Sequence, residues 1–147
     1  MRDGNRKRIT EGKWAEMKKK TAPSMDQWLK EAKMDPNAKE EGMFLVHNGV
    51  VRQTPRDKVR NGVDDGSVVQ GMEFSYDEEK VEKAVEATRK LEGIFAVRVW
   101  LNEGTLEVGD DIMYVLIGGD IRPRVIRALE SLVETIKTTC VVETEQK

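Results

Sequence analysis

The sequence predicts an α+β domain in which two main helices pack on a mostly antiparallel or mixed sheet. Apolar residues alternate between Phe95 and Leu101, which is typical of a strand. They recur at helical spacing from Val81 to Leu91 and again from Val125 to Ile136. Because these elements follow one another without a repeat in a chain of 147 residues, we expect one domain with its own core.

The N-terminal part of the chain differs in charge from the rest. Residues 1–20 hold eight Lys or Arg against three Asp or Glu, a net of +5, so the remainder carries 17 against 24, a net of −7. We predict a basic flexible arm over residues 1–23, a short helix and linker over residues 24–40 with Ser24 as the N-cap, and the main domain over residues 41–147.

The main domain opens with a strand and a basic loop. The run Met43–Arg52 is too apolar for a strand with one face in water, which predicts a central strand. The following residues, 53–67, are rich in Pro, Gly and charge and predict a loop. Its basic side chains Arg56, Lys58 and Arg60 make it a candidate to close over an anionic ligand.

Strand and helix signals then continue to the C-terminus. A strand over Val68–Tyr76 leads to Asp77, the expected N-cap of a helix that stops at Gly93. Further strands are expected over residues 95–101, near Leu106, over residues 112–117 and at Cys140-Val141-Val142. The side chains expected to face the core from the two helices are Val81, Ala84, Val85, Leu91, Val125, Ile126, Leu129, Val133 and Ile136.

The helix from Arg122 to Lys137 has a candidate site residue at each end. Gly118-Gly119 precede its positive end, where free N–H groups and the Arg122 fork can bind an anion; the alternative is a plain turn with a solvated arginine. Lys137 stands where the macrodipole alone favours a cation. The 15 residues between the two span about 22 Å, so one small-molecule site can use both only if they come from different subunits.

The rest of the composition limits the chemistry. One cysteine, Cys140, and one histidine, His47, exclude an internal disulfide and a structural zinc site, and no phosphate loop or Ser/His/Asp set is present. We therefore expect a cytoplasmic protein without metal or cofactor, with no membrane span. His47 is expected as a satisfied core histidine and Cys140 as a small buried strand residue. Arg52 is either a ligand arginine or the first solvated residue of the loop.

Three motifs, in this order and spacing, resemble the large, catalytic subunit of molybdopterin synthase, the MoaE family. They are Gly49-Val50-Val51-Arg52, the stretch from Val99 to Arg122 that contains Gly104-Thr105-Leu106-Glu107-Val108-Gly109-Asp110, and Ile136-Lys137-Thr138. The resemblance covers residues 41–144. It implies an α/β hammerhead-type fold and a homodimer that forms a heterotetramer with a small ubiquitin-like sulfur carrier ending in Gly-Gly.

The resemblance also implies a reaction in molybdenum cofactor biosynthesis. Sulfur would pass from the carrier's thiocarboxylate to cyclic pyranopterin monophosphate, which gives molybdopterin. Carried over by residue, Lys137 matches a catalytic lysine, Arg52 a pocket arginine, and Arg122 an arginine offered across the dimer. Ile121 stands where the family has His, and Thr144 where it has a second Lys.

Three functions therefore remain open at the level of sequence. The first is a sulfurtransferase subunit, the reading that the motif order favours. The second is a non-catalytic paralogue that keeps only the dimer and the partner groove, as Ile121 and Thr144 suggest. The third is a nucleic-acid-associated protein that uses the basic arm; the net charge of −7 outside residues 1–20 argues against it.

Overall fold

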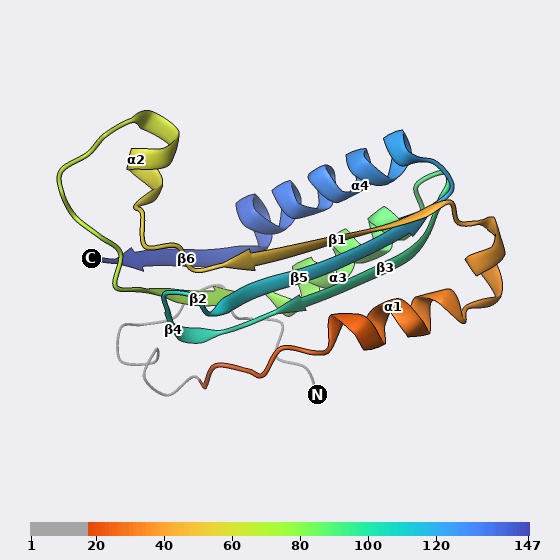
Figure 1. The fold of residues 1–147 in the computed structure, drawn as a ribbon, viewed down its shortest axis with the longest axis horizontal. Coiled ribbons are helices and arrows are strands. Elements are labelled where there is room, and N and C mark those ends of the chain that lie inside the picture. The colour runs from red at the N-terminus through yellow and green to blue at the C-terminus, as the bar shows by residue number, and fades with distance from the viewer. Residues whose placement is uncertain (1–17) are drawn as a thin grey trace.

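Three antiparallel strands form the larger sheet of the computed structural model, which describes residues 18–147 (Figure 1). In this sheet β5 (Asp111–Gly119) lies between β1 (Met43–Val50) and β3 (Ile94–Leu101), and both pairings are antiparallel. Three consecutive residues of β5, from Val115 to Ile117, are fully buried. The centre of the sheet is therefore β5.

A second sheet of three strands continues the fold at the end of the first (Figure 1). Here β2 (Gly71–Tyr76) lies between β4 (Gly104–Glu107) and β6 (Val141–Gln146), again with antiparallel pairing on both sides. The predicted α+β class with antiparallel strands is confirmed. The strands are divided between two sheets, a separation that local alternation of apolar residues does not encode.

Two main helices cover one face of the larger sheet, as predicted. They are α3 (Glu78–Arg89), which packs on β3, and α4 (Arg122–Thr135), which packs on β5 and β1. The helix α1 (Met25–Lys33) lies on the opposite face, where Trp28 meets the ring of Tyr114 edge to face at 6.4 Å (Figure 1). The remaining helical segments are the short 3₁₀ helix η2 (Pro36–Glu40), the short helix α2 (Arg56–Asn61) and a single turn of π-helix, η3 (Ile136–Cys140), which we call the π-turn. None of these helices is long and apolar enough to cross a membrane.

The N-caps of α1 and α3 follow the sequence rules. Ser24 accepts a hydrogen bond from the N–H of Gln27 at 3.2 Å and caps α1. Asp77 accepts one from the N–H of Lys80 at 3.2 Å and caps α3. The expectation that Gly93 stops this helix is not met: α3 ends at Arg89 with Lys90 as its C-cap, and Gly93, with φ +79°, lies in the turn that leads to β3.

Two predictions about the first part of the domain are wrong. The run that begins at Met43 was expected to be a central strand, but within the described residues β1 has only β5 as a neighbour and is an edge strand. The segment expected to be a loop contains α2, which follows Pro55 and ends at Gly62 with φ +69°. Pro at the start and Gly after the end are helix signals, but six residues give too short a period to recognise.

Three further corrections concern element boundaries and faces. Leu91 is 47% exposed and Ile126 is 37% exposed, although both were expected to face the core. The strand β2 begins at Gly71 instead of Val68. Cys140 is buried as expected, but it ends the π-turn that follows α4 and does not belong to β6.

The structure describes only the last part of the predicted basic arm. Residues 1–17 lie outside the described residues, so the nature of that part stays a prediction. Lys19 donates to the carboxylate of Asp110 at 3.0 Å, and the backbone N–H of Lys20 donates to Asn102 Oδ1 at 2.6 Å. The described end of the arm is thus bonded to the domain.

Candidate functional site

Arg52 and Lys137 line one pocket of about 100 Å³, although they are far apart in the sequence. Arg52 follows the end of β1, and Lys137 lies in the π-turn after α4. The ends of β1, α2 and β6 contribute to this pocket. Its full lining is Val50, Arg52, Arg56, Val59, Arg60, Met72, Ile112, Lys137, Glu143 and Glu145. Two of the three predicted site residues are thus brought together within one chain.

The π-turn places Lys137 at the pocket. Ile136 and Cys140, its first and last residues, are buried, so the backbone is held in the core while Lys137 stays exposed. The hydroxyls of Thr138 and Thr139 each donate to the carbonyl four residues earlier, a bond that Thr side chains commonly make to the preceding helical turn. Single turns of π-helix are rare in proteins, and those that occur are often found at functional sites.

Arg52 lines the pocket with an exposed side chain. Its Nε donates to the carbonyl of Thr54 at 2.9 Å, and the side chain is otherwise exposed. A guanidinium fixed through Nε keeps its two Nη groups available for a carboxylate or phosphate. Of the two readings open at the sequence level, the position in the pocket supports the ligand arginine.

His47 on β1 does not line the pocket, but it lies within electrostatic range of Lys137. It is half-buried instead of sitting in the core, and a Cβ added at Gly49 would lie 3.7 Å from its Nε2, so the imidazole extends along β1. Burial lowers the pKa of His47, and the nearby charge of Lys137 lowers it further. Both effects favour the neutral imidazole.

The basic segment after β1 contributes two of its three predicted cations. Arg56 and Arg60 line the pocket, whereas Lys58 points to Asp64, with 3.3 Å between Nζ and the carboxylate. Two carboxylates of β6, those of Glu143 and Glu145, complete the charged lining. With four cationic and two anionic side chains, the lining carries a net charge of +2.

Glu143 and Glu145 were not predicted as site residues. The sequence of β6 does not show which of its two faces lies toward the pocket, because that depends on how β6 pairs with β2. Burial alternates along β6, with Glu143 and Glu145 half-buried and Thr144 exposed. Since alternate strand residues point to opposite faces, Thr144 points away from the face that lines the pocket. Thr144 is thus flanked by two acidic side chains that line the pocket, while it does not line the pocket itself.

Arg122 lies at the other end of α4, outside the pocket of its own chain. The fourteen residues of α4 alone are about 21 Å long. The carboxylate of Asp120 accepts from the N–H of Ile121 at 2.7 Å and from Arg124 at 2.7 Å. The anion at this positive helix end is thus supplied by the chain itself, and Arg122 remains exposed beside it.

Gly118 and Gly119 have packing roles and do not form a phosphate loop. Both belong to β5 and pair with β1 and β3. A Cβ at Gly118 would lie 2.7 Å from the ring of Phe44, and one at Gly119 would lie 2.5 Å from the carbonyl oxygen of Gly93. The prediction that these glycines expose N–H groups for an anion is therefore wrong, and the plain strand-to-helix turn is the correct alternative.

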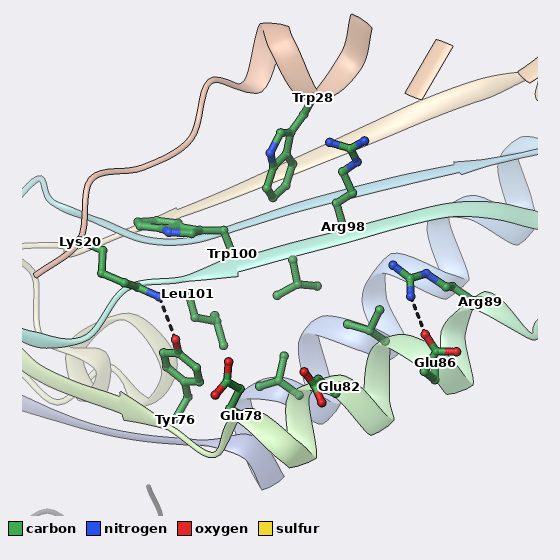
Figure 2. Close-up of a pocket in the computed structure, with 13 residues that line it drawn as sticks. Lys20, Trp28, Tyr76, Glu78, Glu82, Glu86, Arg89, Arg98, Trp100 and Leu101 are labelled. Atoms are coloured by element: carbon green, nitrogen blue, oxygen red, sulfur yellow. Dashed lines mark hydrogen bonds and ion pairs between the residues drawn. The ribbon is translucent and has the colours of Figure 1, made fainter. Parts of the chain in front are cut away.

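A larger cavity of about 590 Å³ lies between α3 and β3, away from these residues (Figure 2). Trp28, Tyr76 and Trp100 contribute aromatic rings to it. The ammonium of Lys20 enters it, donates to the hydroxyl of Tyr76 at 2.8 Å, and lies 5.7 Å from the Trp100 ring (Figure 2). Because none of the predicted site residues lines this cavity, size alone does not identify the candidate site.

Comparison with solved structures identifies the fold. A molybdopterin synthase from Staphylococcus aureus aligns with a TM-score of 0.65 and 18% identity, over 84% of this chain and 85% of that chain. A molybdopterin biosynthesis MoaE protein from Burkholderia ambifaria aligns with a TM-score of 0.63 and 20% identity, over 86% and 79%.

A complex of subunits 1 and 2 of the molybdopterin-converting factor from Helicobacter pylori aligns with a TM-score of 0.58 and 21% identity, over 84% and 79%. At these identities the likeness concerns the fold. No curated protein matches the sequence significantly. The sequence profile of the family described as "MoaE protein" matches residues 19–139, which is most of the chain. The chain therefore belongs to the MoaE family.

Proposed function

We propose that this protein is the large subunit of a molybdopterin synthase. In this role it transfers sulfur in the cytoplasm from a thiocarboxylated small carrier to cyclic pyranopterin monophosphate. Family membership supports a role in molybdenum cofactor biosynthesis. The observation that carries the finer assignment is the shared pocket of Arg52 and Lys137.

The charge of the pocket suits the two reactants. A thiocarboxylate and a cyclic phosphate are each singly negative, and the lining carries a net charge of +2. Bringing two anions together in a cleft requires such compensation, because their mutual repulsion grows as water is excluded. Arg52, Arg60 and Lys137 are the exposed cations of the lining, and we assign Arg52 and Lys137, which match the family's residues, to the reactants.

The chemistry needs positive charge more than a strong base. Each transfer forms one C–S bond to a side-chain carbon of the pterin precursor in place of a C–O bond at that carbon, whose oxygen departs with the phosphate or as water. Water then cleaves the acyl C–S bond of the thioester so formed, which leaves sulfur on the pterin and releases the carrier with a terminal carboxylate. Negative charge develops on the acyl oxygen as water attacks the thioester, and a fixed ammonium stabilises it. Lys137 takes that role, and Arg52 holds an anionic group in place.

One chain does not complete the site. A volume of about 100 Å³ is below the roughly 300–1,000 Å³ of ordinary ligand pockets, which agrees with a site whose further walls come from other chains. Among residues 18–147 no strand pairs with the outer edge of β1, and this edge offers one place for a second copy. Antiparallel pairing of two β1 strands about a two-fold axis would make each a central strand, in agreement with the apolar character of its sequence.

The exposed side of α4 fits the same arrangement. Arg122, Ile126, Leu129, Val133 and Lys137 recur every three or four residues and form one stripe. Val133 and Leu129 are only partly buried, and Ile126 is exposed. A two-fold axis across this stripe sets the helices antiparallel, and Arg122 of the partner subunit then approaches Lys137. This geometry joins the two ends of α4 in one site.

Reconstitution tests the proposal. The purified chain is incubated with a Gly-Gly carrier in its thiocarboxylate form and with cyclic pyranopterin monophosphate, and molybdopterin is measured. We expect product from the wild-type protein and none from Lys137→Ala. Lys83→Ala, which removes an exposed lysine of α3 outside the pocket, is the matched control. Undiminished product from Lys137→Ala would contradict the assignment of the lysine.

A non-catalytic paralogue is the second candidate. Two observations favour it: Ile121, where the family has His, is 51% exposed and offers no polar group, and Thr144 points away from the pocket face. This candidate predicts that the carrier binds the chain in calorimetry while no molybdopterin forms. Product formation by the wild-type protein would exclude it.

A further inference from the structure

The short helix α2 is fixed to β6 at the pocket through Arg56. Its guanidinium Nη2 forms an ion pair with the carboxylate of Glu143. Its backbone N–H donates to both carboxylate oxygens of Glu145, at 3.1 and 3.3 Å. Both ends of the residue are thus held by β6, and α2 lies over the end of that strand (Figure 1).

The ion pair is more sheltered than an ordinary surface pair. The side chain of Glu143 is only 11% exposed, and that of Arg56 is 38% exposed. Exposed pairs contribute little because solvent screens them and the side chains lose freedom, whereas a sheltered carboxylate holds its partner in one orientation. Glu143 therefore fixes the direction of the Arg56 guanidinium.

That direction leaves donors for a ligand. A guanidinium has five N–H donors in a planar fork, and the contact with Glu143 uses one side of it. Arg56 lines the same pocket as Arg52, Arg60 and Lys137. A ligand anion in this pocket therefore meets a guanidinium that is already oriented, so little side-chain entropy is lost on binding.

We propose that Arg56 is a further anion-binding residue of this pocket, positioned by Glu143 and Glu145. The ligand group is a singly charged oxyanion, either the cyclic phosphate of the pterin precursor or the carrier's terminal thiocarboxylate. The identity of these two sources rests on the proposed function. Anion binding itself rests only on the geometry of Arg56 in the pocket.

Binding of inorganic phosphate tests the inference without turnover. Calorimetric titration compares the wild-type protein with Arg56→Ala, Arg56→Lys and the control Arg127→Ala, which removes an exposed arginine of α4 outside the pocket. We expect affinity to fall about 10-fold or more in Arg56→Ala, as for loss of a charged hydrogen bond. A smaller fall is expected in Arg56→Lys, which keeps the charge but loses the fork. Equal affinity in all four proteins would overturn the inference.

Steady-state kinetics then identifies which anion Arg56 binds. Arg56→Ala should raise KM about 10-fold for the pterin precursor or for the carrier, with a smaller change in kcat. Glu143→Gln should raise the same KM less, and the double variant should resemble Arg56→Ala because Glu143 acts through it. If the wild-type protein turns over and Arg56→Ala leaves both KM values unchanged, the inference about Arg56 is overturned while the proposed function stands. Absence of wild-type product would contradict the proposed function, and the phosphate titration would still decide the role of Arg56.

Discussion

The charge of Lys137 in the π-turn lowers the pKa of His47 on β1, in addition to the effect of burial. His47 therefore gives a direct measure of the electrostatics at the candidate site. It is the only histidine of the chain, so its NMR signal is unambiguous. Replacing Lys137 by Met keeps an unbranched chain and removes the charge, and we expect the pKa of His47 to rise.

The sign of the associated stability change follows from that shift. A histidine whose folded-state pKa lies below its unfolded value stabilises the fold above the unfolded value, and the stability is lost as pH falls through the folded pKa. Lys137→Met should therefore reduce the loss of stability on acidification below about pH 6.5. Lys83→Met is the control. An unchanged NMR titration of His47 in Lys137→Met would show that the two groups do not interact.

Ile126 tests the dimer. It is 37% exposed on the stripe of α4 that we assign to the two-fold contact. Ile126→Glu places a charge opposite its own copy, so we expect dissociation to monomers in analytical ultracentrifugation, with the fold unchanged by circular dichroism. Arg127→Glu, on the neighbouring exposed side of the helix, should leave the association state unchanged. Identical sedimentation of the wild-type protein and Ile126→Glu would argue against this contact.

Gly119 tests the packing explanation for the glycines before α4. An added Cβ would lie 2.5 Å from the carbonyl oxygen of Gly93 and 2.8 Å from Val125. We expect Gly119→Ala to lower the free energy of unfolding by about 1–3 kcal/mol in urea denaturation. Gly49→Ala is the matched control in the same sheet, because its Cβ would make only ordinary contacts, the nearest at 3.7 Å. Equal stability of the two variants would contradict the explanation.

Glu41 gives a prediction with the opposite pH dependence. Both its carboxylate oxygens are buried without a hydrogen-bond partner among the described residues, and burial raises its pKa. A carboxyl whose folded-state pKa is raised contributes stability below the unfolded value, and that contribution is lost as pH rises through the folded pKa. Glu41→Gln should therefore raise the Tm at pH 7 and lose this advantage near pH 4. An exposed control, Glu130→Gln, should show no such dependence.

Local patterns were enough to predict the main elements of the fold. The alternation around Val97 and Val99 predicted β3, and the caps Ser24 and Asp77 correctly placed the starts of α1 and α3. These signals lie within one or two turns of chain. Pairing between strands joins residues that are far apart in the sequence, so local patterns do not predict it. For this reason β1 was expected to be a central strand, whereas β5 is the central strand of the larger sheet.

The candidate site was predicted in part for the same reason. Arg52 and Lys137 stood at the ends of recognisable elements, and the structure brings them into one pocket. Glu143 could not be found from sequence, because its role depends on the contact of β6 with Arg56 across the fold. The exposed Ile126 was expected to be buried, and a second subunit would give it the burial that its sequence pattern indicates.

The central claim is that Lys137 of one subunit and Arg122 of the other form one site. Lys137→Ala and Arg122→Ala, each a homodimer, should both make little molybdopterin. When the two variants are mixed and allowed to exchange subunits, half the dimers are hybrids, each with one intact site, so about a quarter of the wild-type activity should return. If the wild-type protein is active and the exchanged mixture stays as inactive as its components, the shared site is contradicted.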